Sequence, residues 1–202
     1  MVQINFARKE LTAKIVYYGP VLGGKRNNLE ILWEKQPPGE KGGITRDDPY
    51  GVGDYTYSLE CAPPEPGTVG GLKVRLHLCT VGACYYNATH KALLQGADGI
   101  IFVVDSKKRK IQENIDCFKN LEENLREQGL ELEKMPHVIQ YNKRDLPDAA
   151  TVAELDKAIN KYGAPTFEAV VKTGEGVYPP LKKLWSMIHE NLVRAYGQGR
   201  KR

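Results

Sequence analysis

The stretch "GPVLGGKRNN" at residues 19–28 contains the first residues whose types and spacing point to chemistry. Gly19, Gly24 and Lys25 match the pattern G-x-x-x-x-G-K, between an apolar run and a helical pattern. Glycines let backbone N–H groups wrap an anion, the start of a helix adds a favourable dipole, and a lysine supplies a point charge. The sequence therefore predicts a phosphate-binding loop formed by Gly19, Gly23, Gly24, Lys25, Arg26 and Asn27.

A second motif, "NKRD" at residues 142–145, follows the apolar run "HVIQY". N-K-x-D reads guanine in Ras-like proteins, because the Asp145 carboxylate accepts from both N1–H and the exocyclic amine, a pair of donors that adenine lacks. Asn142 would bond the base and brace the loop, and the stem of Lys143 would stack on the ring. Residues 169–173 follow the last expected strand, and their backbone would touch the guanine oxygen. The predicted guanine site consists of Asn142, Lys143, Asp145, Val171 and Lys172.

Apolar, β-branched runs that predict strands position these motifs. They cover residues 13–19, 72–81, 99–106 and 137–143, with a weaker fifth at 166–173. The third run is apolar throughout, as a central parallel strand should be. Residues 72–81 alternate apolar and polar side chains, and we expect residues 55–61 to pair with them as an antiparallel edge strand.

Five helical patterns separate the strands and follow the last one: "KRNNLEILWEK", "YYNATHKALLQGA", "IQENIDCFKNLEENLREQGL", "TVAELDKAINKYG" and "YPPLKKLWSMIHENLVRAYG". Residues 35–54 are rich in Gly, Pro and Asp and predict a long loop. Alternating strands and helices predict an α/β protein with a mostly parallel, six-stranded sheet that is covered on both faces.

Composition narrows the class of protein. A chain of 202 residues predicts one domain, over residues 1–196, with a basic disordered tail at 197–202. The net charge of +4 comes largely from that tail, which argues against a nucleic-acid binder. The four cysteines are too scattered for a zinc site and are expected to be free thiols. We find neither a signal peptide nor an apolar run long enough for stable membrane insertion, and we expect a cytoplasmic protein.

Over nearly its full length the chain resembles the MglA-type bacterial Ras-like GTPases, the cell-polarity switches of gliding bacteria. The matching stretches are "KIVYYGP", "GK" at 24–25, "RLHLCTV", "GADGIIFVVDS", "VIQYNKRDLP" and "GEGVYPPLKKL". The resemblance implies a three-layer Ras-like P-loop fold, GTP or GDP as ligand, and a dimeric roadblock-domain (MglB-like) protein or another effector at the switch loops.

The departures from this family fall on the groups that perform hydrolysis. Arg26 replaces the Thr whose hydroxyl binds Mg²⁺, and a guanidinium would instead occupy or repel the metal position or pair with a phosphate. "TVGACYY" at 80–86 replaces T-V-P-G-Q, so no glutamine amide is placed to orient water. Gly53 aligns with the catalytic Arg, and Arg46 would substitute only if its loop refolds. We therefore assign no catalytic residue and no metal ligand, and we leave open whether the chain is an enzyme.

Three hypotheses remain. The first is a guanine-nucleotide-binding switch or scaffold with weak or absent GTP hydrolysis. The second is a pseudo-GTPase interaction module that binds no nucleotide, its pocket empty or blocked by Arg26. The third, an active phosphotransferase with a rearranged metal site, is disfavoured because no acidic residue is placed as a base and N-K-x-D points to guanine.

A few conspicuous side chains receive ordinary structural interpretations. We interpret Cys84 as a small half-buried residue rather than a nucleophile, and His77 as a surface residue on an edge strand. Trp33 and Trp185 fit apolar helix faces. Asp105 is expected to cap or brace the neighbouring phosphate loop rather than to bind a metal.

Overall fold

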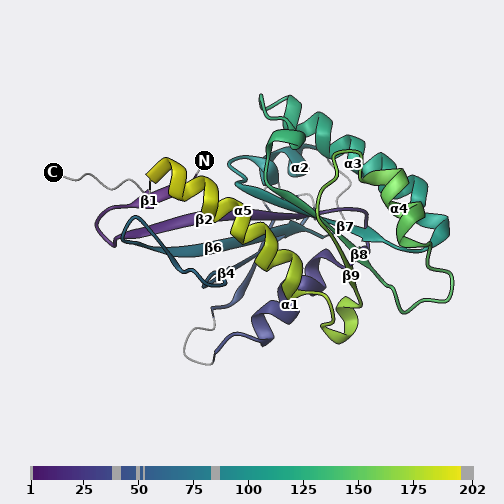
Figure 1. Cartoon of the computed structure of the whole chain (residues 1–202), viewed down its shortest axis with the longest axis horizontal. Coiled ribbons are helices and arrows are strands. Elements are labelled where there is room, and N and C mark those ends of the chain that lie inside the picture. Colours follow the sequence, from purple (N-terminus) through teal and green to yellow (C-terminus); the bar gives the residue numbers. More distant parts are fainter. Residues whose placement is uncertain (1, 38–41, 49–50, 52, 83–86, 197–202) are drawn as a thin grey trace.

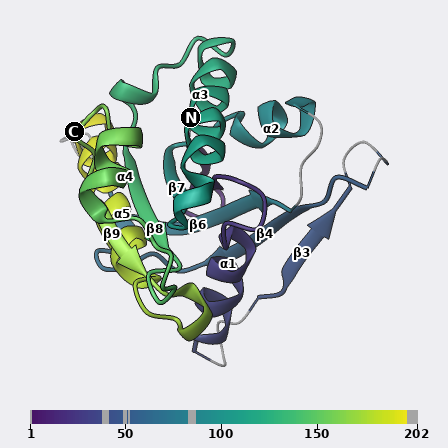
Figure 2. The same ribbon diagram turned by 90° about the vertical axis from the view of Figure 1, so that its right-hand side faces the viewer.

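The computed structural model describes residues 2–37, 42–48, 51, 53–82 and 87–196. Their centre is one twisted sheet with the strand order β3-β4-β6-β2-β7-β8-β9. The strands are β1 (Gln3–Asn5), β2 (Glu10–Tyr18), β3 (Ile44–Asp47), β4 (Thr56–Cys61), β5 (Thr68–Val69), β6 (Leu72–Val81), β7 (Gly99–Asp105), β8 (His137–Asn142) and β9 (Thr166–Ala169). Figure 2 shows β3 at one margin of this sheet and β9 at the other.

Among the described residues, five α-helices cover the two faces of the sheet. They are α1 (Lys25–Glu34), α2 (Asn87–Leu94), α3 (Ile111–Arg126), α4 (Val152–Ile159) and α5 (Tyr178–Tyr196), with 3₁₀ turns η1 (Lys108–Lys110), η2 (Leu132–Lys134) and η3 (Val171–Thr173). One apolar cluster joins α1 and α5 to the sheet, and a second joins α2, α3 and α4 to the opposite face. In Figure 1, α2, α3 and α4 lie above the sheet and α1 lies below it. These layers confirm the predicted mixed α/β fold.

The parallel core follows from strand composition. Every residue of β7 is buried, because a strand covered by helices on both faces can place apolar side chains at each position. Parallel pairing continues from β6 through β2, β7 and β8 to β9. The carboxyl ends of these strands therefore meet at one edge, where open α/β sheets bind ligands.

The predicted sheet was too small. The described part of the chain forms nine strands rather than six. Strand β3 lies inside the expected loop 35–54 and pairs antiparallel with β4. β1 and β5 are two or three residues long and pair antiparallel with β2 and β6. Such short segments carry too little periodicity to be seen in the sequence, and they exist because a longer neighbour offers its backbone groups.

The edge assignment was wrong as well. β4 does pair antiparallel with β6 as predicted, with Thr56 opposite Val81, but β3 covers its outer side. Strand β6 consequently lies between β4 and β2, and His77 is half-buried within the sheet rather than exposed on an edge. Burial lowers the pKa of His77, and the nearby Lys14 adds to that effect.

The two tryptophans pack as expected. Trp185 is fully buried in the cluster under α5, and Trp33 packs partly buried against the same cluster. The predicted tail at 197–202 lies outside the described residues. Within the described residues, no helix combines the length and the apolar character that crossing a bilayer requires.

Candidate functional site

The glycine-rich loop connects β2 to α1, and two of its glycines are required by space as well as by backbone shape. Gly19 has φ +146°, and a Cβ there would lie 2.1 Å from the carbonyl oxygen of Val103. Gly24 has φ +105°, and a Cβ there would lie 2.2 Å from Nδ2 of Asn142. The loop thus passes directly against the ends of β7 and β8, which a side chain at either position would prevent.

Lys25 begins α1 and is only 4% exposed. Its ammonium donates to the carbonyl oxygens of Gly19 at 2.9 Å and Pro20 at 2.8 Å. The charge is therefore held inside the curve of the loop, where an anion wrapped by the loop would meet it.

Asn142 connects three segments that are far apart in the sequence. Its Nδ2 donates to the carbonyl oxygen of Gly23 at 2.8 Å. Its Oδ1 accepts from the backbone N–H of Val171 at 3.0 Å and of Lys143 at 2.7 Å. A single buried amide thus holds the phosphate loop, the "NKRD" turn and the loop after β9 in one arrangement.

Asp105 has a different partner from the one predicted. Its Oδ2 accepts from the ammonium of Lys143 at 2.6 Å, and its Oδ1 accepts from the backbone N–H of Lys107 at 3.2 Å. Asp105 is 1% exposed, so this ion pair is largely shielded from water. The expectation that Asp105 braces the phosphate loop was wrong, because the neighbouring β8 brings Lys143 closer.

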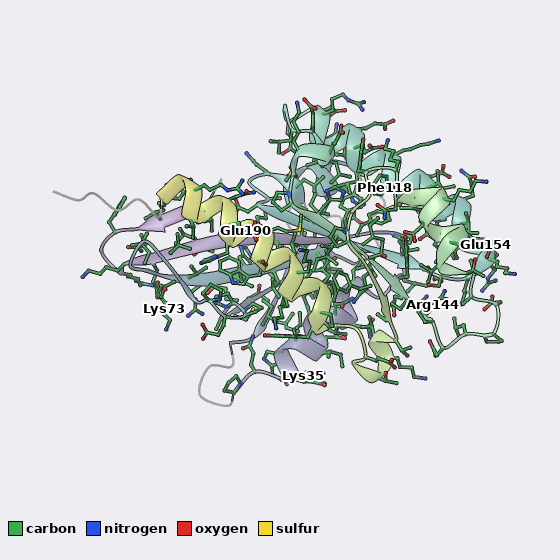
Figure 3. All side chains as sticks on the ribbon, in the orientation of Figure 1. Lys35, Lys73, Phe118, Arg144, Glu154 and Glu190 are labelled. Carbon is green, nitrogen blue, oxygen red and sulfur yellow. The ribbon has the colours of Figure 1, made fainter. Side chains whose placement is uncertain are left out.

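Arg144, which follows Lys143 in the "NKRD" turn, is also held by the surrounding elements. Its Nε donates to Glu168 at 2.8 Å, and its backbone N–H donates to the carbonyl oxygen of Ala169. Figure 3 places Arg144 at the end of the molecule near α4. The turn therefore points Arg144 toward β9, whereas the exposed Asp145 lines the cavity described next.

A cavity of about 390 Å³, which we call the base cavity, is lined by all five predicted guanine-site residues and by part of the phosphate loop. Its volume is within the range of small-molecule sites. Its lining consists of Leu22, Gly24, Asn27, Lys107, Asn142, Lys143, Asp145, Leu146, Val170, Val171 and Lys172. The structure thus brings together residues predicted separately from two motifs and from a third loop.

A second space of about 240 Å³, the switch hollow, lies beside the phosphate loop. Its lining consists of Gly19, Pro20, Val21, Lys25, Val81, Gly82, His90, Glu113, Asp116, Cys117 and Asn120. Gly19 and Lys25 therefore face this hollow rather than the base cavity, and Gly23 and Arg26 line neither space.

Sequence reasoning missed Leu22, Lys107 and Leu146 of the base cavity. Leu22 lies in the phosphate loop with φ +60° and an 83% exposed side chain. Lys107 follows β7 at the carboxyl edge of the sheet. The rule that ligands bind at this edge would have identified Lys107, whereas nothing in the motif distinguishes Leu22 from the other variable loop positions.

Arg26 turns away from both spaces. Its Nε donates to Glu30 at 2.8 Å, and its guanidinium lies 4.6 Å from the centre of the Tyr57 ring on β4. Its Nη1 also donates to the Tyr57 hydroxyl at 3.4 Å. Blockage of the pocket by Arg26, one form of the pseudo-GTPase hypothesis, is not observed, because a carboxylate and an aromatic face nearby hold the charge.

Magnesium does not fit the residue at the family's metal-ligand position. A guanidinium carries only donors and cannot coordinate a cation. Guanine nucleotide does fit the surrounding groups, because the glycine loop, Lys25 and the exposed carboxylate of Asp145 are all present at the edge of the sheet.

Several residues at the positions of the family's hydrolytic groups have structural partners. The Thr80 hydroxyl is buried and donates to the carbonyl oxygen of Tyr17 at 2.9 Å. The backbone N–H of Gly82 donates to the carbonyl oxygen of Tyr55 at 2.9 Å. Arg46 stacks on the Tyr55 ring at 3.4 Å from its centre and lines neither space. Gly53 is exposed, and Ala83 and Cys84 lie outside the described residues.

His90 of α2 lies in the switch hollow. Its ring lies 4.8 Å from that of Tyr18. Burial lowers the pKa of His90 to about 4, and the nearby Lys25 adds to that effect. Its Nδ1 is buried without a hydrogen-bond partner among the described residues.

The described cysteines are free thiols, as predicted. Burial raises the pKa of Cys61, Cys79 and Cys117 to about 12. Protonated thiols of this kind are unreactive and serve as small apolar residues.

Comparison with known proteins extends these observations. The sequence model of the ADP-ribosylation factor family (Arf) matches residues 80–188. The chain is 42% identical over 192 residues to the mutual gliding-motility protein MglA of Myxococcus xanthus, covering 95% of this chain and 97% of that protein. It is also 32% identical over 92 residues to the GTPase Obg of Caldicellulosiruptor bescii, covering 45% of this chain and 22% of that protein. The chain therefore belongs to the MglA-type Ras-like small GTPases, a family of small GTP-binding switch proteins.

Proposed function

We propose that this member of the family binds GDP or GTP without the usual magnesium ligand and hydrolyses GTP weakly or not at all. The observation that carries the proposal is the base cavity, in which Asn142 ties the phosphate loop, the "NKRD" turn and the loop after β9 together. A site assembled from three distant segments and closed by one buried amide is suited to a ligand that spans all three.

Each end of a guanine nucleotide has a matching group. The Asp145 carboxylate would accept from the guanine edge, with Val171 and Lys172 beside the base. Backbone N–H groups of the glycine loop and the ammonium of Lys25 would hold the phosphates. The third phosphate of GTP would supply the negative charge that distinguishes the two states of the switch.

Hydrolysis requires groups that this chain has replaced. Arg26 cannot bind Mg²⁺, and it contacts Glu30 and Tyr57 in place of a phosphate. Arg46, the candidate substitute for the family's catalytic arginine, stacks on Tyr55. Because metal, water placement and positive charge each supply a large share of phosphoryl-transfer catalysis, their combined loss should lower the rate by several orders of magnitude.

The elements beside the phosphate loop, β4 and α2, provide the surface for protein partners. Tyr57 of β4 and His90 of α2 both lie close to the phosphate loop, so a nucleotide there would alter what these elements present. We assign this surface to a roadblock-domain (MglB-like) regulator or another switch-loop effector. By analogy with the M. xanthus protein named for mutual gliding motility, the process served would be motility or cell polarity.

One observation favours the alternative of a pseudo-GTPase that binds no nucleotide. The ammonium of Lys25 is held by the loop's own carbonyl oxygens of Gly19 and Pro20, and a phosphate would have to compete with these bonds. Calorimetric titration with GDP and with GTP, each with Mg²⁺ and with EDTA, separates the two functions. Saturable heat of similar affinity in Mg²⁺ and EDTA supports our proposal, and a flat trace for both nucleotides supports the pseudo-GTPase.

Phosphate release measured on the same samples tests the hydrolytic part. We expect GTP binding with little or no phosphate release above the uncatalysed rate. Turnover typical of an active phosphotransferase would contradict the proposal.

A further inference from the structure

A pair of buried carboxamides lies beneath the site without lining either space. Asn28 on α1 and Gln140 on β8 are both 0% exposed. Nδ2 of Asn28 donates to Oε1 of Gln140 at 2.9 Å, and Nε2 of Gln140 donates to Oδ1 of Asn28 at 3.0 Å. The two side chains therefore form a closed, reciprocal ring of hydrogen bonds between residues 112 positions apart in the sequence.

The remaining N–H groups of this pair hold two loops of the site. Nδ2 of Asn28 also donates to the carbonyl oxygen of Gly24 at 3.0 Å, in the phosphate loop. Nε2 of Gln140 also donates to the carbonyl oxygen of Gly176 at 2.9 Å, in the loop after β9. All four amide N–H groups are thus used, two within the pair and one on each loop.

Gln140 and Asn142 are two residues apart on β8, so their side chains share one face of the strand. Asn142 joins Gly23 to Val171 beside the base cavity. The Asn28–Gln140 pair repeats this connection one step deeper, between the same two loops. The phosphate loop and the loop after β9, which we call the base-side loop, are consequently joined twice.

Core stability alone does not require such a pair. The surrounding cluster is apolar, and each buried amide hydrogen bond contributes only about 1 kcal/mol net. Apolar side chains of similar volume would lose only the hydrogen bonds to the carbonyl oxygens of Gly24 and Gly176. The amides have a further effect, because their hydrogen bonds are directional and fix the orientation of the carbonyl groups of the two loops.

We infer that Asn28 and Gln140 are positioning residues that hold the phosphate loop in register with the base-side loop and thereby slow nucleotide release. This inference rests on the proposed function. It assigns to the pair no contact with the nucleotide, since neither residue lines the base cavity or the switch hollow.

The test uses the full chain and three variants. Asn28→Val/Gln140→Val replaces both amides by apolar groups of nearly the same total volume. Asn28→Gln/Gln140→Asn exchanges the two amides and keeps their summed length. Asn191→Val on α5, outside the site, is the matched control. For each chain, the release rate of a fluorescent GDP analogue and the melting temperature without nucleotide are measured.

We expect the apolar pair to release the analogue about tenfold faster or more and to melt a few degrees lower, because the carbonyl oxygen of Gly176 loses its donor. The exchanged pair should restore slow release to within about threefold, a rescue that a purely structural role would not require. Unchanged release in the apolar variant, with binding by the natural chain intact, overturns the inference alone. Failure of the natural chain to bind GDP overturns both this inference and the proposed function.

If the apolar variant does not fold, hydrogen exchange of the side-chain amide protons in the natural chain tests the inference instead. The Nε2 protons of Gln140 should be protected from solvent both with and without GDP, because the pair is formed before the ligand arrives. Rapid exchange without nucleotide would contradict a preformed positioning pair.

Discussion

Asn142 in the base cavity and His90 in the switch hollow lie in neighbouring parts of one site, yet they are partnered very differently. Both polar atoms of the Asn142 side chain form hydrogen bonds, and a second amide pair supports them from below. Within the described part of the chain, His90 has a buried Nδ1 without a partner and a pKa lowered by burial. The base side is therefore arranged in advance for a ligand, whereas the switch side contains a polar group that its described neighbours leave unsatisfied.

The same contrast appears in the residues that the family uses for chemistry. The base cavity keeps Asn142, Lys143 and Asp145 at one edge of the sheet. On the switch side, Arg26 stands at the metal-ligand position and contacts Glu30 and Tyr57. Recognition of a base and cleavage of a phosphate depend on different groups, so one can be retained after the other has changed. The predictions below test each side of this contrast.

The largest effect is expected at Lys25, which serves the phosphate end. Lys25→Met should weaken GDP binding about 100-fold, because a charge-assisted hydrogen bond to phosphate contributes roughly 1.5–3 kcal/mol. Calorimetry measures the affinity, with the exposed Lys183→Met on α5 as control. An unchanged affinity in the Lys25 variant would mean that the loop binds no phosphate.

Asp145→Asn tests the base side. The variant should bind GDP about 30-fold more weakly and gain affinity for xanthosine diphosphate, because an amide replaces one acceptor by a donor. Asp145 is exposed, so the melting temperature should not change. Asp148→Asn, three residues along the same turn, is the control. Equal GDP affinity in the natural chain and the Asp145 variant would remove the guanine assignment.

Arg26→Thr tests the switch side. Threonine restores a hydroxyl that can coordinate a cation, so Mg²⁺ should strengthen GDP binding about tenfold in this variant and leave the natural chain nearly unaffected. Arg26→Gln removes the same charge without supplying that hydroxyl and should remain insensitive to Mg²⁺. A similar response of both variants to the metal would show that our account of Arg26 is wrong.

His90 should give the smallest effect, seen in the pH dependence of stability. Its folded pKa of about 4 lies below the ordinary 6.5, so the unfolded chain binds the proton first. Stability attributable to His90 is therefore complete above pH 6.5 and is lost as the pH falls toward 4, by an amount on the order of 2 kcal/mol.

Urea unfolding at several pH values measures this loss. The groups near His90 are Lys25, which opposes its protonation, Asp54, which favours it, and the Tyr18 ring. His90→Phe keeps an aromatic ring beside Tyr18 and should make the curve shallower between pH 6.5 and 4. His189→Gln on α5 is the control. An identical curve for the natural chain and the His90→Phe variant would exclude His90 as the source.

Local sequence determined much of this protein. Glycines at 19 and 24 before Lys25 specify a tight turn into a helix, and the uninterrupted apolar run at 99–104 specifies a strand covered on both faces. The five helical patterns each became an α-helix, because their apolar periodicity is long enough to select one structure. These features also sufficed to place the "NKRD" turn at the carboxyl edge of the sheet.

Only the tertiary structure decided which side chains meet. Asp105 pairs with Lys143, Arg26 stacks on Tyr57, and Asn28 joins Gln140 across 112 residues. The short strand β3 likewise exists because β4 offers its backbone groups. Hydrogen bonds and ion pairs depend on distances of a few ångströms between elements, and sequence periodicity determines which face of an element is buried without determining which partner lies opposite it.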